Sequence, residues 1–120
     1  MVDLLTSEQL DQYLQEDPGG PVAMLNLLRF KPDGGRERYF EYVEAIHDIG
    51  ERVGLRRLFA GLGGTALVAE PGQEWDAVAI VEYPSRQAFV DMVRSPEYRA
   101  SAHLRTEALV EATLQPTQPL

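Results

Sequence analysis

Val22-Ala-Met-Leu-Asn-Leu-Leu-Arg-Phe30 is the stretch that decides the fold, because it is an almost unbroken apolar run with one amide, Asn26, at its centre. A strand that has one face in water alternates apolar and polar side chains. This stretch does not alternate, and neither does Ala77-Val-Ala-Ile-Val81. The pattern therefore predicts two strands that are each covered on both faces.

Segments with helical periodicity separate these strands. Between residues 36 and 53, apolar side chains recur at three- and four-residue steps, which predicts one amphipathic helix. A second helical region, 85–107, is predicted to be split by Ser95-Pro96, a typical helix start. Further strands are expected at 55–60 and 108–114, and residues 65–70 and 75–83 are expected to form a hairpin around a type II turn at 70–73.

The order of these elements indicates an α+β fold with ferredoxin-like β-α-β-β-α-β connectivity and an antiparallel sheet. An extra helix precedes it, since Thr6 and Gln9 form a capping-box pair and Asp17-Pro-Gly-Gly-Pro21 ends the helix. We expect a single domain over 1–120, with residues 1–20 as the helical extension, 22–115 as the core and 116–120 as a frayed tail.

Helices in this connectivity cover only one face of the sheet, so the second apolar face of the strands needs another cover. The simplest cover is the same face of a second chain, which predicts a homodimer with two sheets packed face to face. The alternative is that the N-terminal helix covers this face within one chain. A helix of about ten residues would cover only part of a four-stranded sheet.

Composition excludes several classes of function. The formal net charge of −8 disfavours binding to nucleic acid or to anionic membranes. The chain has no cysteine, so disulfides and thiolate metal sites are excluded. Residues 1–5 lack the basic, long apolar pattern of a signal peptide, and no apolar stretch approaches the ~20 residues that span a bilayer. A cytoplasmic protein is the expectation.

Three blocks of sequence resemble the dimeric α/β-barrel superfamily, and within it the small bacterial family described as domain of unknown function 1330. They are Met24–Leu27 with the following helix that carries Tyr39 and Tyr42, the corner Ile80–Ser85, and Ser95-Pro-Glu-Tyr98 with Leu104-Arg105. The resemblance implies a homodimer with a small cavity between sheet and helices in each subunit. The superfamily includes cofactor-free quinone-forming monooxygenases, heme-degrading monooxygenases, chlorite-splitting enzymes, lactone isomerases and members without known activity.

Three residues are candidates for catalysis. Asn26 is a polar group inside an apolar strand, and it resembles the first-strand asparagine of the superfamily's monooxygenases. Glu82 shares a strand face with Ile80 and would need a cation, for which Arg105 or Arg29 is available. His47 lies at the margin of an apolar helix stripe and is a candidate general base. Each has a structural alternative: a backbone-bonded amide, a structural ion pair and an edge histidine.

Tyr42, Tyr98 and Arg105 are the candidates for substrate binding, with the phenol rings lining a cavity and the guanidinium holding an anionic group. The first hypothesis is therefore a cofactor-free monooxygenase- or isomerase-like enzyme acting on a small, partly apolar substrate. The alternative is a non-catalytic small-ligand-binding or structural dimer. A heme-degrading enzyme is a second alternative, for which His103 lies one position away from the axial histidine that the resemblance implies. No metal site or bound cofactor is expected.

Overall fold

A single antiparallel sheet of four strands forms the centre of the part of the chain that the computed structural model describes, residues 5–120. The expectation about a signal peptide concerned residues 1–5, of which 1–4 lie outside this described part. The elements follow the order α1 (Ser7–Gln15), β1 (Val22–Phe30), α2 (Gly35–Ala45), α3 (His47–Val53), β2 (Arg56–Leu62), β3 (Ala77–Tyr83), α4 (Arg86–Arg94), α5 (Pro96–Ala108) and β4 (Leu109–Thr117).

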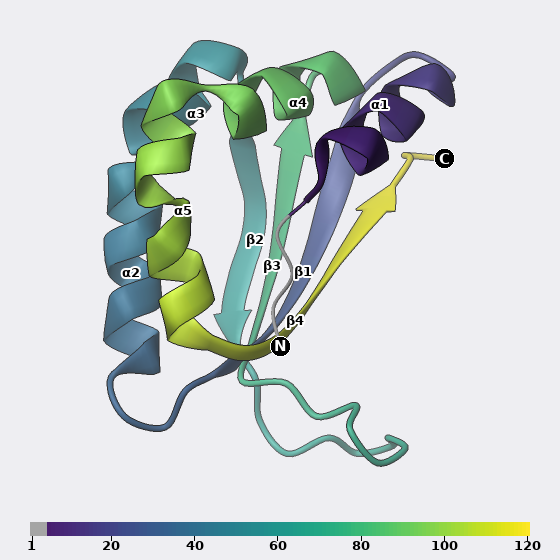
Figure 1. The fold of residues 1–120 in the computed structure, drawn as a ribbon. Coiled ribbons are helices and arrows are strands. Elements are labelled where there is room, and N and C mark those ends of the chain that lie inside the picture. Colours follow the sequence, from purple (N-terminus) through teal and green to yellow (C-terminus); the bar gives the residue numbers. More distant parts are fainter. Residues whose placement is uncertain (1–4) are drawn as a thin grey trace.

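The strand order in the sheet is β2-β3-β1-β4 (Figure 1). The strand β1 lies between β3 and β4, so that Leu25 is opposite Ile80 on one side and Gln115 on the other. Both neighbours run antiparallel to β1. This is the ferredoxin-like arrangement that the sequence predicts, and the α+β fold is confirmed.

The two faces of β1 have different surroundings, because successive side chains of a strand point to opposite faces. Val22, Met24 and Leu28 point toward the helices and are almost completely buried, with exposed fractions of 4%, 2% and 1%. Val22 and Met24 belong to a core with residues of α1, α3 and α4, whereas Leu28 packs in a second core with Ala77, Ala108 and Leu109. The helices thus cover one face of the sheet.

The opposite face, called here the open face, has no helix on it among residues 5–120 (Figure 1). Leu25 and Leu27 of β1 point to it, as do Val78 and Ile80 of β3, and all four remain partly exposed. Leu10 of α1 is buried in the core on the helical face, beside Val22 and Phe89. The alternative that the N-terminal helix covers the open face is therefore wrong.

One helix and one strand have boundaries that differ from the sequence expectation. The helix predicted over 36–53 is interrupted at Ile46, which ends α2 and precedes α3. Strand β4 continues to Thr117 into the predicted tail, with Pro116 paired to Met24. Proline is tolerated there because β4 is an edge strand and need not donate on its outer side.

The predicted hairpin is also different, since residues 65–70 form no strand and β3 begins at Ala77. Residues 63–76 instead form a long loop, called here the arm, which projects beyond the sheet at the bottom of Figure 1. The turn predicted at 70–73 is confirmed: Gly72 has a φ of +85° and the Gln73 N–H donates to the Glu70 carbonyl at 3.1 Å.

Replacing Ser95 by alanine is expected to lower the free energy of unfolding by about 1 kcal/mol. The Ser95 hydroxyl accepts a hydrogen bond from the Tyr98 N–H at 3.1 Å and donates one to the Met92 carbonyl at 2.7 Å. It therefore caps α5 and closes α4 together. Urea denaturation would measure the loss, and Ser101→Ala, which removes only a hydroxyl bond within one helix, is the matched control. Equal losses in both variants would contradict the capping role.

Candidate functional site

Four tyrosines and one arginine gather between the sheet and the helices α2 and α5; they are called here the tyrosine–arginine cluster and are Tyr39, Tyr42, Tyr83, Tyr98 and Arg105. Tyr39 and Tyr42 lie three residues apart on α2, and Tyr98 and Arg105 lie seven apart on α5. Both spacings place side chains on one face of a helix. Because α2 and α5 lie side by side, these faces meet (Figure 1).

Close contacts join the aromatic members of the cluster. The hydroxyl oxygens of Tyr42 and Tyr98 are 2.9 Å apart and share a hydrogen bond. The Tyr42 and Tyr98 rings meet edge to face with centroids 6.0 Å apart, and the Tyr39 ring lies 5.4 Å from that of Tyr42. Such ring pairs add stability beyond the area that they bury. The cluster is therefore a packed group with fixed phenol positions.

Arg105 brings a positive charge into this apolar surrounding. Its Nη2 atom is buried and makes no hydrogen bond with any residue of the described part of the chain. The guanidinium lies close enough to Tyr39 and Tyr42 to oppose the rise of their pKa values. A buried guanidinium nitrogen without an acceptor is costly. The site thus offers a donor to an oxygen that residues 5–120 do not supply.

Burial keeps the phenols of Tyr39, Tyr42 and Tyr83 neutral. It raises the pKa of Tyr42 well above its ordinary value of 10, and the neighbouring Tyr98 and Tyr39 add to the rise. Burial also raises the pKa values of Tyr39 and Tyr83. At neutral pH these side chains are therefore O–H groups that can donate hydrogen bonds to an anionic oxygen.

Asn26 lies on the sheet floor under the same helical layer. Its side chain is on the face of β1 that looks toward the helices, opposite Ala79 and Leu114, and it is 8% exposed. The side-chain amide donates to the Met24 carbonyl at 3.4 Å, a long bond. Of the predicted site residues, Asn26, Tyr42, Tyr98 and Arg105 thus occur on one side of the sheet.

The two other candidates lie elsewhere in the protomer. Glu82 points to the open face, and its carboxylate pairs with Arg56 at 2.8 Å, not with Arg105 or Arg29. His47 is at the surface at the start of α3, where its Nε2 lies 3.1 Å from Glu51. Neither side chain joins the tyrosine–arginine cluster. His103, the residue on which the heme alternative depended, is exposed on α5.

Tyr39 is a member of the cluster that was not predicted as a site residue. The sequence signal was its three-residue spacing from Tyr42, which was interpreted only as part of an apolar stripe. Tyr83 belongs to the corner Ile80–Ser85, and no site role is predicted for it from the sequence. It is 5% exposed at the end of β3. Burial raises its pKa, the nearby Tyr98 adds to the rise, and the Arg105 guanidinium opposes it.

Stability is expected to fall as the pH rises above 10, because buried phenols hold their protons more firmly in the folded state than in the unfolded state. The raised pKa values stabilise the fold fully below the ordinary tyrosine pKa, and this contribution disappears as the pH rises through the folded-state values. Urea denaturation between pH 9 and 12, on the scale of tyrosine titration, measures the slope. Tyr83→Phe should make the slope shallower. Phenols that all ionise near pH 10 in the folded protein would contradict the expectation.

Residues 5–120 contain no group of three or more histidine, aspartate or glutamate side chains arranged to hold a metal ion. Over the same residues, none of the helices combines the length and the apolar character that a bilayer crossing demands.

Comparisons with known proteins identify relatives of the chain. Residues 34–114 match the family described as "Domain of unknown function (DUF1330)". A crystal structure of RPA0582, a protein of unknown function from Rhodopseudomonas palustris, has a TM-score of 0.87 at 35% sequence identity, covering 98% of this chain and 95% of that chain. The search of curated proteins found no significant match.

More distant structures share the fold. A dimeric ferredoxin-like protein of unknown function from Thermobifida fusca has a TM-score of 0.58 at 13% identity, covering 83% of this chain and 92% of that chain. A protein from Caulobacter crescentus that is named as a candidate antibiotic biosynthesis monooxygenase has a TM-score of 0.63 at 10% identity, covering 91% and 98% of the two chains. Identities this low establish a common fold and nothing about activity.

Proposed function

The chain belongs to the DUF1330 family of domains of unknown function, and from this premise we propose that it is a homodimer that binds a small, partly aromatic ligand through an anionic oxygen at the tyrosine–arginine cluster. The observation that carries the ligand proposal is the buried Arg105 Nη2, which lacks an acceptor among residues 5–120. A carboxylate or enolate oxygen at this nitrogen would form a charge-assisted hydrogen bond, which is stronger than a neutral one.

The surroundings of Arg105 suit a ligand with an aromatic or otherwise flat apolar body. The Tyr39, Tyr42 and Tyr98 rings would contact such a body, and their hydroxyls would donate to its oxygens. Ligand sites commonly combine apolar walls with a few fixed polar groups. The cluster has this composition, and Asn26 adds an amide on the sheet floor.

Proton transfer by the protein has less support than binding. The cluster contains donors and a cation, while the two candidate bases, Glu82 and His47, are paired with Arg56 and Glu51 away from it. We therefore favour a ligand-binding protein. A cofactor-free oxygenase or isomerase is the second candidate. It is favoured by the hydrogen-bonded Tyr42–Tyr98 pair, which would stabilise an oxyanion formed by a substrate that loses its own proton.

The test uses benzoate and 1-naphthoate as probes, with benzamide as the neutral isostere, and follows binding by NMR shift changes in the uniformly labelled protein. We expect the carboxylates to bind at least about ten times more tightly than benzamide, because a charge-assisted bond is worth more than about 1.4 kcal/mol over a neutral one. Arg105→Gln should remove this preference, and Arg99→Gln, at an exposed position on the same helix, should keep it. Binding of neither carboxylate, or equal binding by the two variants, would remove the proposal.

The open face supports the second half of the proposal, a dimer through the sheets. Its apolar centre, formed by Leu25, Leu27 and Ile80, is left partly exposed by the helical layer. A second copy of the face would remove these side chains from water, with a gain of roughly 25 cal/mol for each Å² of apolar surface. Several structures with this fold are described as dimeric, which supports self-association.

A further inference from the structure

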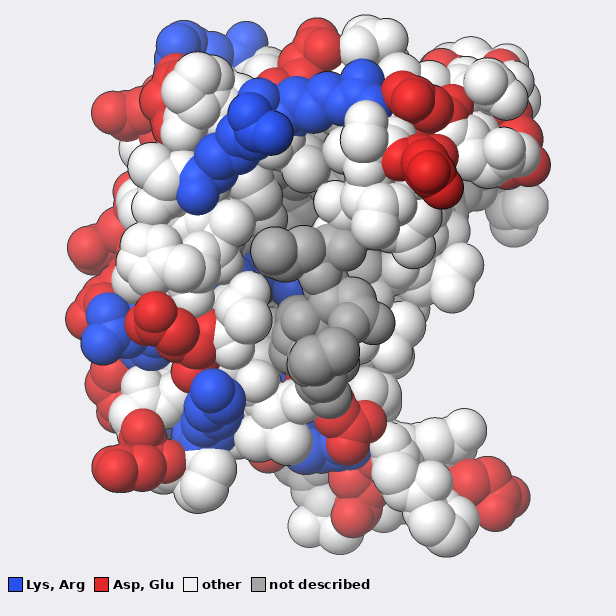
Figure 2. Space-filling model, in the orientation of Figure 1, with Lys and Arg blue, Asp and Glu red and all other residues white. Residues whose placement is uncertain are grey.

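The arm, residues 63–76, carries two of the most exposed apolar side chains of the described chain. Leu67 is 99% exposed and Val68 is 96% exposed. Figure 2 shows the arm as a mostly uncharged projection at the lower right, with the outline of the molecule hollowed above it. Single exposed apolar residues are common, but an adjacent fully exposed pair at the end of a projecting loop is a candidate contact surface.

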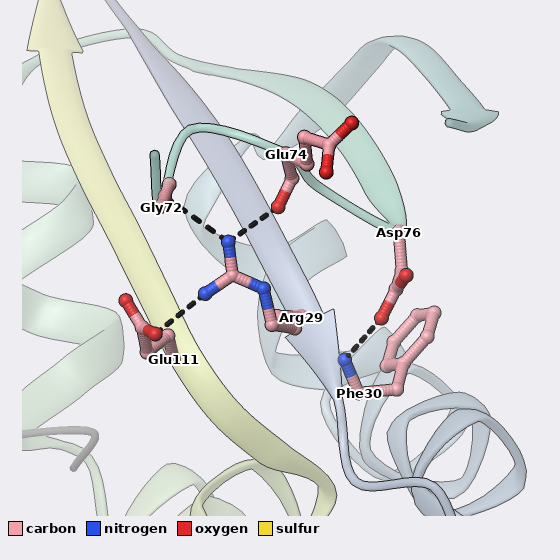
Figure 3. Close-up of polar contacts among 6 residues, drawn as sticks. All are labelled: Arg29, Phe30, Gly72, Glu74, Asp76 and Glu111. Atoms are coloured by element: carbon pink, nitrogen blue, oxygen red, sulfur yellow. Dashed lines mark hydrogen bonds and ion pairs between the residues drawn. The ribbon is translucent and has the colours of Figure 1, made fainter. Parts of the chain in front are cut away.

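A dense set of polar contacts fixes the base of the arm. Arg29 donates to the Glu74 carbonyl, to the Gly72 carbonyl at 3.1 Å and to the Glu111 carboxylate at 2.5 Å (Figure 3). Its guanidinium also lies 4.7 Å from the centre of the Trp75 ring. The Arg29 side chain thus contributes its positive charge to the pair with Glu111 and its flat guanidinium to the contact with the Trp75 ring. The base of the arm is therefore fixed against the sheet.

The ends of the arm are joined equally closely. The Asp76 carboxylate accepts from the Phe30 N–H at 2.9 Å, and the Gly63 N–H donates to the Asp76 carbonyl at 2.8 Å. A side chain at Gly63 would place its Cβ 2.1 Å from the Trp75 carbonyl oxygen, so only glycine fits this approach. The arm is thus presented in a defined direction.

That direction is the side of the open face. Arg29 is in β1 between Leu27 and the strand end, and its side chain points to the same face as Leu25 and Leu27 because the three positions alternate with buried ones. Since Arg29 binds the arm through two backbone carbonyls, the arm begins on the face that lacks helices. Leu67 and Val68 are therefore carried by a loop whose base is fixed on the side of the open face.

The charges of the open face favour a second copy of the chain as the occupant. Arg29 is paired with Glu111, and Arg56 with Glu82, so the charges of these opposed strand positions cancel. The chain as a whole carries −8. A locally neutral apolar surface on an acidic protein avoids the repulsion that two identical chains would otherwise experience.

We propose that each arm reaches across the dimer and packs Leu67 and Val68 against the partner, so that two arms clasp the pair of sheets. This inference rests on the proposed dimer and adds to it a contact outside the sheet faces. An isologous contact of this kind is made twice, since two-fold symmetry repeats each interaction. A substitution in the arm therefore acts on the dimer twice.

The first test measures the dimer dissociation constant by sedimentation equilibrium for the full chain and for the double variant Leu67→Asp, Val68→Asp. We expect an increase of about 100-fold or more, because four carboxylates would replace four apolar contacts per dimer. The matched control is Phe40→Asp, Val43→Asp, which adds the same charge at exposed apolar positions of α2. An arm variant that dimerises as tightly as this control would overturn the clasp.

The face variant Leu27→Asp separates this inference from the dimer itself. If the unmodified chain is a monomer, the dimer proposal fails and the clasp fails with it. If the chain dimerises, Leu27→Asp dissociates it and the arm variant does not, only the clasp fails. The association states of the unmodified chain, the face variant and the arm variant thus distinguish failure of the dimer from failure of the clasp alone.

A second test uses the absence of cysteine from the chain. A single Val68→Cys variant can be labelled with a thiol reagent without background. We expect its reaction rate at high protein concentration to be at least about ten times lower than that of Val43→Cys, since a buried thiol is inaccessible to the reagent. The protection should disappear on dilution below the dissociation constant. Equal rates at every concentration would contradict the proposal.

Discussion

Leu28→Ala is expected to lower the free energy of unfolding by about 3 kcal/mol, within the range seen when a buried leucine is truncated. Leu28 is 1% exposed in the second half of β1, between strands β3 and β4. It packs in the smaller core with Ala77, Ala108 and Leu109, where two of the three other buried members are alanines. Such short side chains cannot move to fill the cavity, so the loss should be close to its full value.

Urea denaturation at a fixed protein concentration measures this loss, because the stability of the proposed dimer would depend on concentration. The matched control is Leu62→Ala on β2, where the leucine is 58% exposed. Its expected loss is below about 1 kcal/mol, since most of its surface already contacts water. A Leu28→Ala protein as stable as this control would show that the smaller core is not packed as described.

Leu27→Asp is expected to leave the fold intact and to convert the proposed dimer into a monomer at micromolar concentration. Leu27 precedes Leu28 in β1, but its side chain points to the open face and is partly exposed in the protomer. A carboxylate at the centre of two packed sheets would lose its hydration without gaining a partner. We expect the dissociation constant to rise by about 1,000-fold, which corresponds to about 4 kcal/mol.

Sedimentation velocity measures the association state, and circular dichroism measures whether the fold persists. Val43→Asp is the matched control, since it adds one carboxylate at an exposed position on α2 and should remain dimeric. A dimeric Leu27→Asp protein would show that the chain does not associate through the open face. Loss of the fold would show instead that Leu27 is needed within the protomer.

The fold could be predicted from the sequence because its strongest signals are local or nearly local. The unalternating run of β1 required cover on both faces, and the Ser95-Pro96 pair marked the division between α4 and α5. The capping box of Thr6 and Gln9 is present as predicted. Each of these signals depends on residues within a few positions of one another, so no knowledge of register was needed.

Features that depend on register and tertiary contact could not be predicted. The pairing of Glu82 with Arg56 depends on an irregularity in the register between Arg57 and Phe59, which no residue type marks in the sequence. The break at Ile46 has no glycine or proline to indicate it. The arm follows from the contacts of Arg29 with residues more than 40 positions later in the chain.

The candidate site was predicted in part for a related reason. Tyr98 is a candidate as a phenol and Arg105 as a cation for an anionic group, and the structure brings them beside Tyr42 because α2 and α5 pack together. Tyr39 was missed because an aromatic residue at helical spacing also fits an ordinary core stripe. Only the position of α5 shows that this stripe faces a guanidinium.

Strand β1 carries Asn26 and Leu27 as immediate neighbours with opposite orientations, one toward the side of the tyrosine–arginine cluster and one toward the open face. The two proposed binding events, of a ligand and of a second chain, would therefore share a single backbone segment. Thermodynamic linkage makes any influence between them reciprocal: a ligand that strengthens association must itself bind the associated form more tightly, by the same factor. Titrations at several protein concentrations would reveal this cooperativity, and its sign would show whether occupancy and assembly assist or oppose each other.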